Sequence, residues 1–338
     1  MTEREGEMRY RELGQSGIKA SVVGLGAWAI GGWMWGGTEE KESIETIKTA
    51  LDSGINLIDT APVYGFGLSE EIVGRAIKGI RAGVVIATKC GLVWNKEAGE
   101  FHFMSDEKAV RSDSGNIKVF KYLAPDSVRR EIEMSLRRLG TEYIDLYQTH
   151  WQDATTPVED TMNELLKLKQ EGKIKAIGVS NATPGHLERY MKTGQLDTDQ
   201  ESYSMLDRQK EKDLLPYCAA HKIAFLAYSP LARGLLTGKI SPGRVFMDGD
   251  QRKGNPRYSP ENRIRILEML EKFRPFAEKY GITFTQLAIA WALHQKGCTH
   301  ALVGARKTHQ ALENANAGDI ILTSEDLRAI NRIIDTYS

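Results

Sequence analysis

Residues 55–89 read INLIDTAPVYGFGLSEEIVGRAIKGIRAGVVIATK, and the fold is decided by the order of patterns within them. Short apolar runs at 56–59 and 84–89 predict two buried strands. Between them, residues 69–78 carry apolar side chains at helical spacing and predict a helix. Strand, helix and strand in this order form a βαβ unit, whose two strands run parallel.

The same alternation extends in both directions along the chain. Upstream, residues 22–26 predict a buried strand, and residues 39–53 predict a helix that ends before Gly54. Downstream, helices are expected over 125–139, 158–171, 184–193, 211–221, 260–295 with a break at Gly281, and 308–317, and strands over 144–150, 174–180, a short stretch near Gln200, 224–228 and 301–303.

Eight strand-then-helix units favour an α/β fold of the closed (β/α)8 TIM-barrel type over an open, doubly wound sheet. A β-hairpin over residues 9–21 precedes the barrel, and an extra helix over 324–337 follows it. The whole chain, 1–338, is expected to form one domain. Residues 91–123 and 232–259 interrupt the alternation and predict long polar loops over the mouth of the barrel.

Composition limits the kind of partner that the protein binds. Lys+Arg and Asp+Glu both number 45, so no overall charge attracts nucleic acid or an anionic membrane. The 3 cysteines are far apart, the N-terminus lacks the apolar run of a signal peptide, and no stretch is long and apolar enough to span a membrane. The 7 histidines show no HExxH spacing, so no metal site is expected. These features predict a cytoplasmic protein.

Four polar side chains fall at or just after the predicted ends of successive strands: Asp59, Tyr64, Lys89 and His150. In a TIM barrel these ends converge on one face. A tyrosine is a poor acid at neutral pH unless a cation stabilises its phenolate, and Lys89 supplies that cation. Asp59 would keep the lysine charged, and His150 would orient a carbonyl oxygen. This set predicts proton donation to a carbonyl while a bound cofactor supplies hydride.

From about Arg9 to Tyr337, the sequence resembles the aldo-keto reductases. The resemblance is carried by the stretches GLGAW at 24–28, LIDTAPVYG at 57–65, IATK at 86–89, YIDLYQTH at 143–150 and IKAIGVSN at 174–181. It identifies Asp59, Tyr64, Lys89 and His150 as the family's catalytic tetrad. Within the family, the chain looks most similar to bacterial members of the general-stress and inositol-operon branch.

The resemblance also implies an NADP(H) cofactor. Ser180, Asn181 and Gln200 match positions that hold the nicotinamide carboxamide, and Tyr228 matches the aromatic residue that stacks on the ring. Arg306 is the natural partner of an adenosine 2′-phosphate and favours NADPH, although many relatives place a lysine and a serine here. The alternative that Arg306 only caps a surface loop stays open. The full set of expected cofactor contacts is Ala27, Trp28, Asp59, Ser180, Asn181, Gln200, Tyr228, Ser229, Pro230, Leu231, Arg233, Gly234, Leu236, Gly238, Lys239, Arg252, Gly304, Ala305, Arg306, Gln310 and Asn314.

Tryptophans near strand ends predict an aromatic mouth, which would stack on the C–H faces of a sugar or wall off an apolar aldehyde. The loops also carry polar groups, including His102, Arg111, Lys118, Lys121 and Arg257. We therefore favour a sugar or another polyhydroxylated carbonyl compound, while simple solvation of these polar groups stays open. The expected substrate contacts are Trp28, Trp33, Tyr64, Trp94, His150 and Trp151.

Two other classes of function are compatible with parts of this pattern. Some proteins with the aldo-keto reductase fold are regulatory subunits that bind NADP(H) without catalysis, and an intact tetrad alone does not exclude that role. A barrel isomerase or aldolase would need a Schiff-base lysine or a base poised without a nucleotide, and the expected phosphate-binding loops argue against it. The glycines at 24 and 26 do not indicate a Rossmann fold, because Ala29 occupies the third glycine position and no helix follows.

Overall fold

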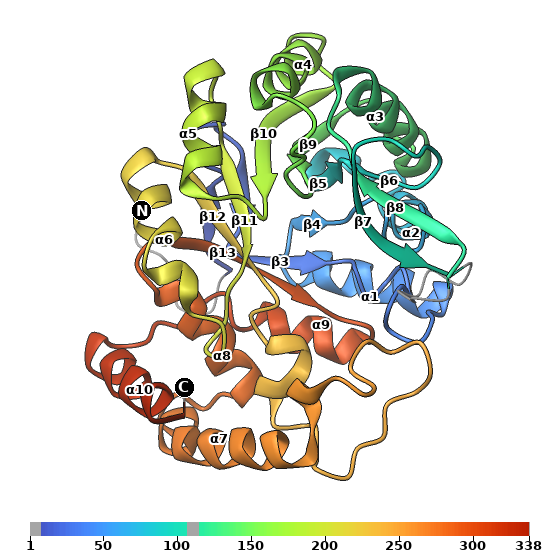
Figure 1. Cartoon of the computed structure of the whole chain (residues 1–338). Helices are drawn as coiled ribbons and strands as arrows, with labels where there is room; N and C mark the ends of the chain where they lie inside the picture. Colours follow the sequence, from blue (N-terminus) through green and yellow to red (C-terminus); the bar gives the residue numbers. More distant parts are fainter. Residues whose placement is uncertain (1–7, 107–114, 338) are drawn as a thin grey trace.

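The computed structural model describes residues 8–106 and 115–337. Eight parallel strands close into a barrel in the order β10-β11-β12-β13-β3-β4-β5-β9 (Figure 1). The barrel strands are β3 (Val23–Gly26), β4 (Leu57–Asp59), β5 (Val85–Cys90), β9 (Ile144–Thr149), β10 (Ile174–Ser180), β11 (Thr198–Ser202), β12 (Ala224–Tyr228) and β13 (Cys298–Gly304). The predicted (β/α)8 barrel is confirmed.

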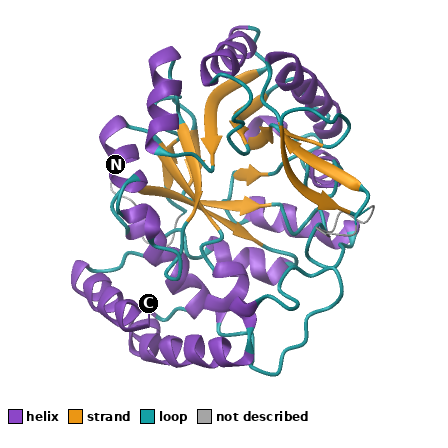
Figure 2. Cartoon of the chain, in the orientation of Figure 1, coloured by secondary structure: helices purple, strands orange, loops and turns teal. Residues whose placement is uncertain are grey.

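Helices surround the strands (Figure 2). The α-helices are α1 (Glu40–Asp52), α2 (Leu68–Ala76), α3 (Pro125–Leu139), α4 (Val158–Gln170), α5 (Pro184–Thr193), α6 (Leu214–His221), α7 (Pro260–Tyr280), α8 (Phe284–His294), α9 (Thr308–Ala315) and the extra α10 (Ser324–Tyr337). Short 3₁₀ helices are η1 (Arg81–Gly83), η2 (Gln209–Glu211), η3 (Ala232–Thr237) and η4 (Pro256–Tyr258). The break expected at Gly281 is present, since this residue caps α7 in the left-handed conformation, with φ 64°.

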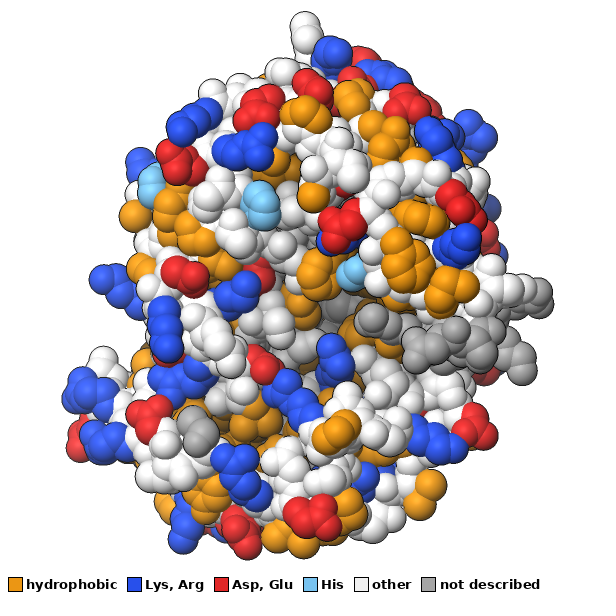
Figure 3. Space-filling view, in the orientation of Figure 1, with side chains coloured by type: hydrophobic (Ala, Val, Ile, Leu, Met, Phe, Trp, Pro, Cys, Tyr) orange, Lys and Arg blue, Asp and Glu red, His pale blue; other side chains and the backbone are white. Residues whose placement is uncertain are grey.

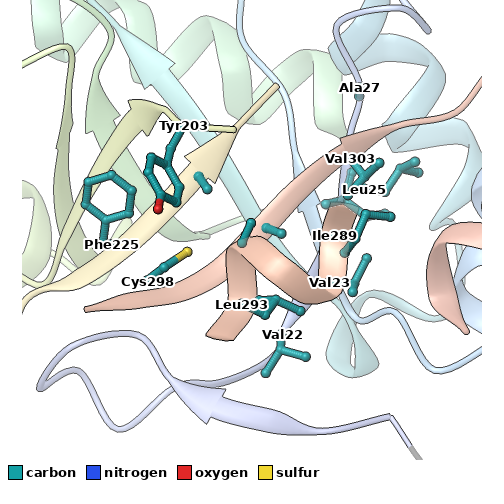
Figure 4. Close-up of a cluster of buried hydrophobic side chains, with 14 of the residues drawn as sticks. Val22, Val23, Leu25, Ala27, Tyr203, Phe225, Ile289, Leu293, Cys298 and Val303 are labelled. Atoms are coloured by element: carbon teal, nitrogen blue, oxygen red, sulfur yellow. The ribbon is translucent and has the colours of Figure 1, made fainter. Parts of the chain in front are cut away.

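Apolar side chains pack on both sides of the strands. Outside the barrel, Val23, Leu25 and Val303 lie near Ile289 and Leu293 of α8 (Figure 4). Inside, a second buried cluster fills the barrel and consists of Leu13, Ala20, Leu57, Val85, Ala87, Leu146, Ala176, Ala224, Leu226 and Leu302. The barrel is therefore a packed core rather than a pore.

The predicted hairpin is present and covers the N-terminal end of the barrel. Strands β1 (Tyr10–Glu12) and β2 (Lys19–Ser21) pair antiparallel. Leu13, which follows β1, and Ala20 of β2 belong to the cluster inside the barrel. Arg11 Nη1 donates to the carbonyl oxygens of Cys298 and Thr299 at 3.2 Å each. The hairpin closes the N-terminal end of the barrel, so the end that stays open to a ligand is the one where the strands have their C-termini.

The segment after β5, predicted as a long loop, contains a small antiparallel sheet. Strands β6 (Leu92–Val93), β8 (Ile117–Lys121) and β7 (Glu100–Ser105) lie in that order and are here named the flap. Its buried side chains pack on the aromatic residues of the mouth. Arg111, one of the polar groups noted above, lies outside the described residues. The prediction of an irregular loop is therefore corrected, because alternating side chains find a buried face above the barrel.

A second segment, residues 240–259, follows η3 along the chain and borders the mouth without forming a sheet (Figure 1); it is here named the strap. Arg263 of α7 holds it by donating to the carbonyl oxygens of Ser241, Pro242, Arg244 and Tyr258 at 2.6–3.1 Å. Across residues 8–106 and 115–337, none of the helices has both the length and the apolar character needed to cross a membrane.

Candidate active site

The four polar residues predicted at strand ends meet at the C-terminal end of the barrel. Asp59 ends β4, Lys89 lies in β5, and His150 directly follows β9. Lys89 Nζ lies 2.6 Å from Asp59 Oδ1, 2.9 Å from the Thr60 carbonyl oxygen and 3.3 Å from Tyr64 Oη. The rings of Tyr64 and His150 meet edge to face, with centroids 5.7 Å apart. The four residues predicted from the sequence therefore form one cluster.

Burial dominates the electrostatics of this cluster. Burial, and then the charge of Asp59, raises the pKa of Tyr64 well above its ordinary value. Burial lowers the pKa of Lys89, while the adjacent Asp59 carboxylate opposes that shift, as the sequence predicted. Burial, followed by the charges of Lys89 and His102, lowers the pKa of His150 well below its ordinary value. Tyr64 is therefore protonated and His150 neutral at neutral pH.

Two glutamines complete the surroundings of Asp59. Gln200 Nε2 donates to Asp59 Oδ2 at 2.8 Å, and Gln148 Nε2 reaches the same oxygen at 3.3 Å. Gln200 Nε2 also lies 3.3 Å from Gln148 Oε1. Gln148 was missed by the sequence reasoning. A glutamine inside a buried strand needs hydrogen-bond partners, and that requirement was the available signal.

The residues expected around the nicotinamide form one hydrogen-bonded chain. Tyr228 Oη donates to Asn181 Oδ1 at 2.9 Å, and Asn181 Nδ2 donates to the His150 carbonyl oxygen at 2.9 Å. Ser180 Oγ donates to the Gln200 carbonyl oxygen at 2.7 Å. Asn181 has a φ of 53°, a conformation that asparagine tolerates better than most residues. These side chains link β9, β10, β11 and β12 beside the tetrad.

The segment expected to bind pyrophosphate has an unusual backbone. Ser229, Ala232, Arg233 and Gly234 have φ values of 57°, 47°, 53° and 102°. Turns of this kind collect backbone N–H groups into a concavity that suits an anion. Lys239 adds a cation, which pairs with Glu313 at 2.7 Å.

Arg252 and Arg306 lie near this segment but already have partners. Arg252 forms an ion pair with Asp250 at 2.6 Å and lies over the Trp35 ring. Arg306 donates to the carbonyl oxygens of Trp35 and Gly37 at 2.9 and 2.7 Å. Arg306 therefore ties the start of α9 to the loop after β3. This contact was not foreseen, and it competes with the phosphate contact expected for the same guanidinium.

Aromatic rings wall the mouth beside Tyr64. Trp28 and Trp33 both stack on Tyr64, with ring centroids 6.2 Å away in each case. Trp151 contacts His102 of the flap, with centroids 5.0 Å apart. Trp94 instead packs on Phe66 at 5.0 Å and is not among the described residues that line the cavity. Its predicted contact with substrate stays a prediction.

One cavity of about 860 Å³ joins these parts, in the upper range for ligand sites. The tetrad members Asp59, Tyr64 and His150 line it, while Lys89 lies behind them. Most of the expected cofactor contacts line it too; among the described lining residues, Ala27, Leu236 and Gly238 are absent. Lys and Arg side chains border the hollow at the centre of the face in Figure 3. Across the described part of the chain, no group of three or more His, Cys, Asp or Glu could hold a metal ion.

Known proteins resemble the chain over nearly its full length. The family model described as the Aldo/keto reductase family matches residues 22–335. The aldo-keto reductase YhdN of Bacillus subtilis (strain 168) is 42% identical over 331 residues, which cover 97% of this chain and 94% of that protein. The NADH-specific methylglyoxal reductase of Escherichia coli (strain K12) is 42% identical over 325 residues, which cover 94% and 96%.

A solved structure agrees in both fold and sequence. The glycerol dehydrogenase AKR11B4 from Gluconobacter oxydans superimposes with a TM-score of 0.84 and is 41% identical. The match covers 98% of this chain and 96% of that one. The resemblance found in the sequence is therefore confirmed by both kinds of comparison.

Proposed function

Because the chain belongs to the aldo/keto reductase family, we propose that it reduces an aldehyde or ketone to the alcohol with NADPH, and that Tyr64 is the general acid. The observation that carries the proposal is the position of Lys89 Nζ, 2.6 Å from Asp59 Oδ1 and 3.3 Å from Tyr64 Oη. A buried cation at this position can stabilise the phenolate that proton donation leaves behind.

Each tetrad residue has a role that its surroundings support. When bound, the nicotinamide cofactor supplies hydride to the carbonyl carbon. Tyr64 Oη gives its proton to the carbonyl oxygen, and Lys89 stabilises the negative charge that develops on Oη. Asp59 holds Lys89 in place and favours its charged form. His150, neutral at neutral pH, donates a hydrogen bond that orients the carbonyl oxygen.

The cavity has groups that fit a dinucleotide along its length. Gln200, Asn181 and Ser180 would hold the carboxamide, and Tyr228 would pack on the ring. The turn at residues 229–234 and Lys239 would receive the pyrophosphate. Adenosine would lie toward α9, near Gln310 and Asn314, which also line the cavity.

The preference for NADPH depends on Arg306. A permanently charged guanidinium at the start of α9 suits a 2′-phosphate. Its bonds to the carbonyl oxygens of Trp35 and Gly37 would have to be shared or released. A relative 42% identical to this chain is named an NADH-specific reductase, so NADH is the competing cofactor in every test.

The substrate proposed is a hydroxylated carbonyl compound. Trp28, Trp33 and Trp151 offer aromatic faces to C–H groups, and all three line the cavity beside Tyr64 and His150. The names of two relatives refer to small compounds, methylglyoxal and glycerol. The single-domain organisation and the cytoplasmic location expected from the sequence belong to the same proposal.

The test is a screen of aldehydes, ketones and polyols with NADPH and NADH side by side. We expect oxidation of NADPH by hydroxylated aldehydes, and faster turnover with NADPH than with NADH. A protein that binds NADPH tightly yet turns over none of the carbonyl compounds would instead be a regulatory subunit. Faster turnover with NADH would agree with the proposed carbonyl reduction but contradict the proposed contact of Arg306 with a 2′-phosphate.

A further inference from the structure

The flap contains a β-bulge at the point where it faces the cavity. Strand β7 pairs with β8 through Phe101 opposite Phe120 and Phe103 opposite Val119, with a shift of register between the two pairs. His102 is the extra residue in that shift. A bulge of this kind re-aims a side chain and occurs often beside active sites.

The bulge changes which side chains reach the cavity. In a regular strand, two successive side chains point to opposite faces. Here both His102 and Phe103 line the cavity. Phe103 lies against Trp33, with centroids 5.8 Å apart, and His102 lies against Trp151, with centroids 5.0 Å apart. One extra residue thus brings an imidazole to the same wall as a buried phenyl ring.

This imidazole is the polar contribution of the flap to the site. Of the described flap residues that line the cavity, Leu92 and Phe103 are apolar and His102 is polar. Its ring lies against Trp151, the residue that directly follows His150, so the two imidazoles line the same end of the cavity. His150 is one of the two groups expected to contact the reacting oxygen, so His102 lies beside the place of the neighbouring substrate atoms.

We propose that His102 is a specificity-determining residue, whose imidazole hydrogen-bonds a hydroxyl group carried near the reacting carbonyl. It selects hydroxylated carbonyl compounds over unsubstituted ones and takes no part in hydride or proton transfer. The inference rests on the proposed reduction of carbonyl compounds and names the substrate feature that the site reads. An imidazole can donate or accept such a bond, whereas a phenyl ring does neither and an indole N–H can only donate.

The test compares D-glyceraldehyde with propanal, which has the same carbon chain without hydroxyl groups, using NADPH. His102→Phe keeps a ring against Trp151 but removes both ring nitrogens. We expect it to lower kcat/KM for glyceraldehyde by about five- to tenfold, the scale of one hydrogen bond, mainly through KM. Propanal should change by less than about twofold, on the same scale. His102→Gln, which retains hydrogen-bonding groups, should recover most of the loss.

Phe101→Leu is the matched control, since Phe101 adjoins the bulge but is 52% exposed and is not among the described lining residues. This variant should leave the ratio of kcat/KM for glyceraldehyde to kcat/KM for propanal unchanged. Equal losses for both substrates in His102→Phe would mean a packing role and overturn the inference, as would unchanged kinetics. A wild-type protein that reduces neither compound would instead contradict the proposed function itself.

Discussion

The flap and the strap border the same cavity but are held by different forces. The flap is a paired sheet whose inner side chains, such as Phe103 and Val119, are buried among aromatic rings. The strap has almost no regular structure. It is held by guanidinium groups, with Arg263 bonded to four of its carbonyl oxygens and Arg257 paired with Asp207 at 2.7 Å.

This difference matches what each side would bind. The aromatic wall beside the flap suits recognition of a carbon chain, because backbone pairing and packing fix the shape of that wall. The strap instead depends on hydrogen bonds from guanidinium groups and lies near the turn proposed to bind phosphate, where such bonds can be exchanged for ligand contacts. We therefore expect changes in the strap to affect the cofactor, and changes in the flap to affect the substrate.

Tyr64→Phe should have the largest effect and provides the reference for both regions, because Tyr64 lines the same cavity as both of them. It removes the proposed proton donor and should lower turnover by about 10²-fold or more. NADPH affinity and the far-ultraviolet circular dichroism spectrum should stay nearly unchanged. Steady-state kinetics with a hydroxylated aldehyde measure the loss, and near-normal turnover would remove Tyr64 from its role.

Arg306→Ala tests the cofactor side directly. Loss of a charge-assisted contact to the 2′-phosphate should weaken NADPH by about 1.5–3 kcal/mol, or roughly 10- to 150-fold, and NADH much less. Fluorescence titration of both cofactors gives the two dissociation constants. Equal losses would show that Arg306 serves the carbonyl oxygens of Trp35 and Gly37 rather than the phosphate.

Arg263→Met tests whether the strap acts on the cofactor. Arg263 is 7% exposed, and its loss leaves several strap carbonyl oxygens without their donor. We expect a lower Tm and about a tenfold higher KM for NADPH, the scale of one charge-assisted hydrogen bond, with little change in KM for the aldehyde. Arg265→Met, at an exposed position of the same helix, is the control. A rise confined to the KM for the aldehyde would contradict the expectation that the strap acts on cofactor binding.

Trp151→Ala tests the flap side, since its ring lies against His102. KM for hydroxylated substrates should rise about threefold to tenfold, the scale of one aromatic contact, while small unsubstituted aldehydes change little. KM values for both classes at saturating NADPH decide the outcome. Equal increases would mean that Trp151 shapes the catalytic pocket as a whole, and the argument for a hydroxylated substrate would lose its support.

The smallest expected effect is a flat pH profile near neutrality. The lowered pKa of His150 keeps the imidazole neutral, and the raised pKa of Tyr64 keeps the phenol protonated, so neither group titrates between about pH 6 and 8. The value of kcat/KM for propanal, which has no hydroxyl group for His102 to bind, should therefore stay constant across that window. A limb with its midpoint near 6.5, the ordinary value of histidine, would indicate an imidazolium in the reaction.

Much of the fold was predictable because most barrel strands are short apolar runs and several helices end at a glycine, as α7 does at Gly281. Even the short strand near Gln200 was anticipated, and it is β11. The flap was not, because its strands pair across an intervening segment and its bulge disturbs the alternation of β7. Sequence periodicity detects local structure, whereas pairing between distant segments depends on what covers their apolar face.

Within the site, the strand-end residues were predictable because barrel topology alone brings them together. Gln148 and the carbonyl contacts of Arg306 were not, since a hydrogen bond to a distant backbone oxygen leaves no pattern in the sequence. The strap illustrates the same limit. Its polar composition indicated a loop, but only the structure shows that one arginine of α7 holds it.

The bulge at His102 makes the flap a convenient place for evolutionary change. Deleting one residue from β7 would restore the regular alternation and turn either His102 or Phe103 away from the cavity. The flap is inserted between β5 and α3, so such a deletion would leave the barrel strands and the tetrad in register. Related proteins could thus diverge in substrate choice through length changes in this segment, without a substitution in the catalytic core.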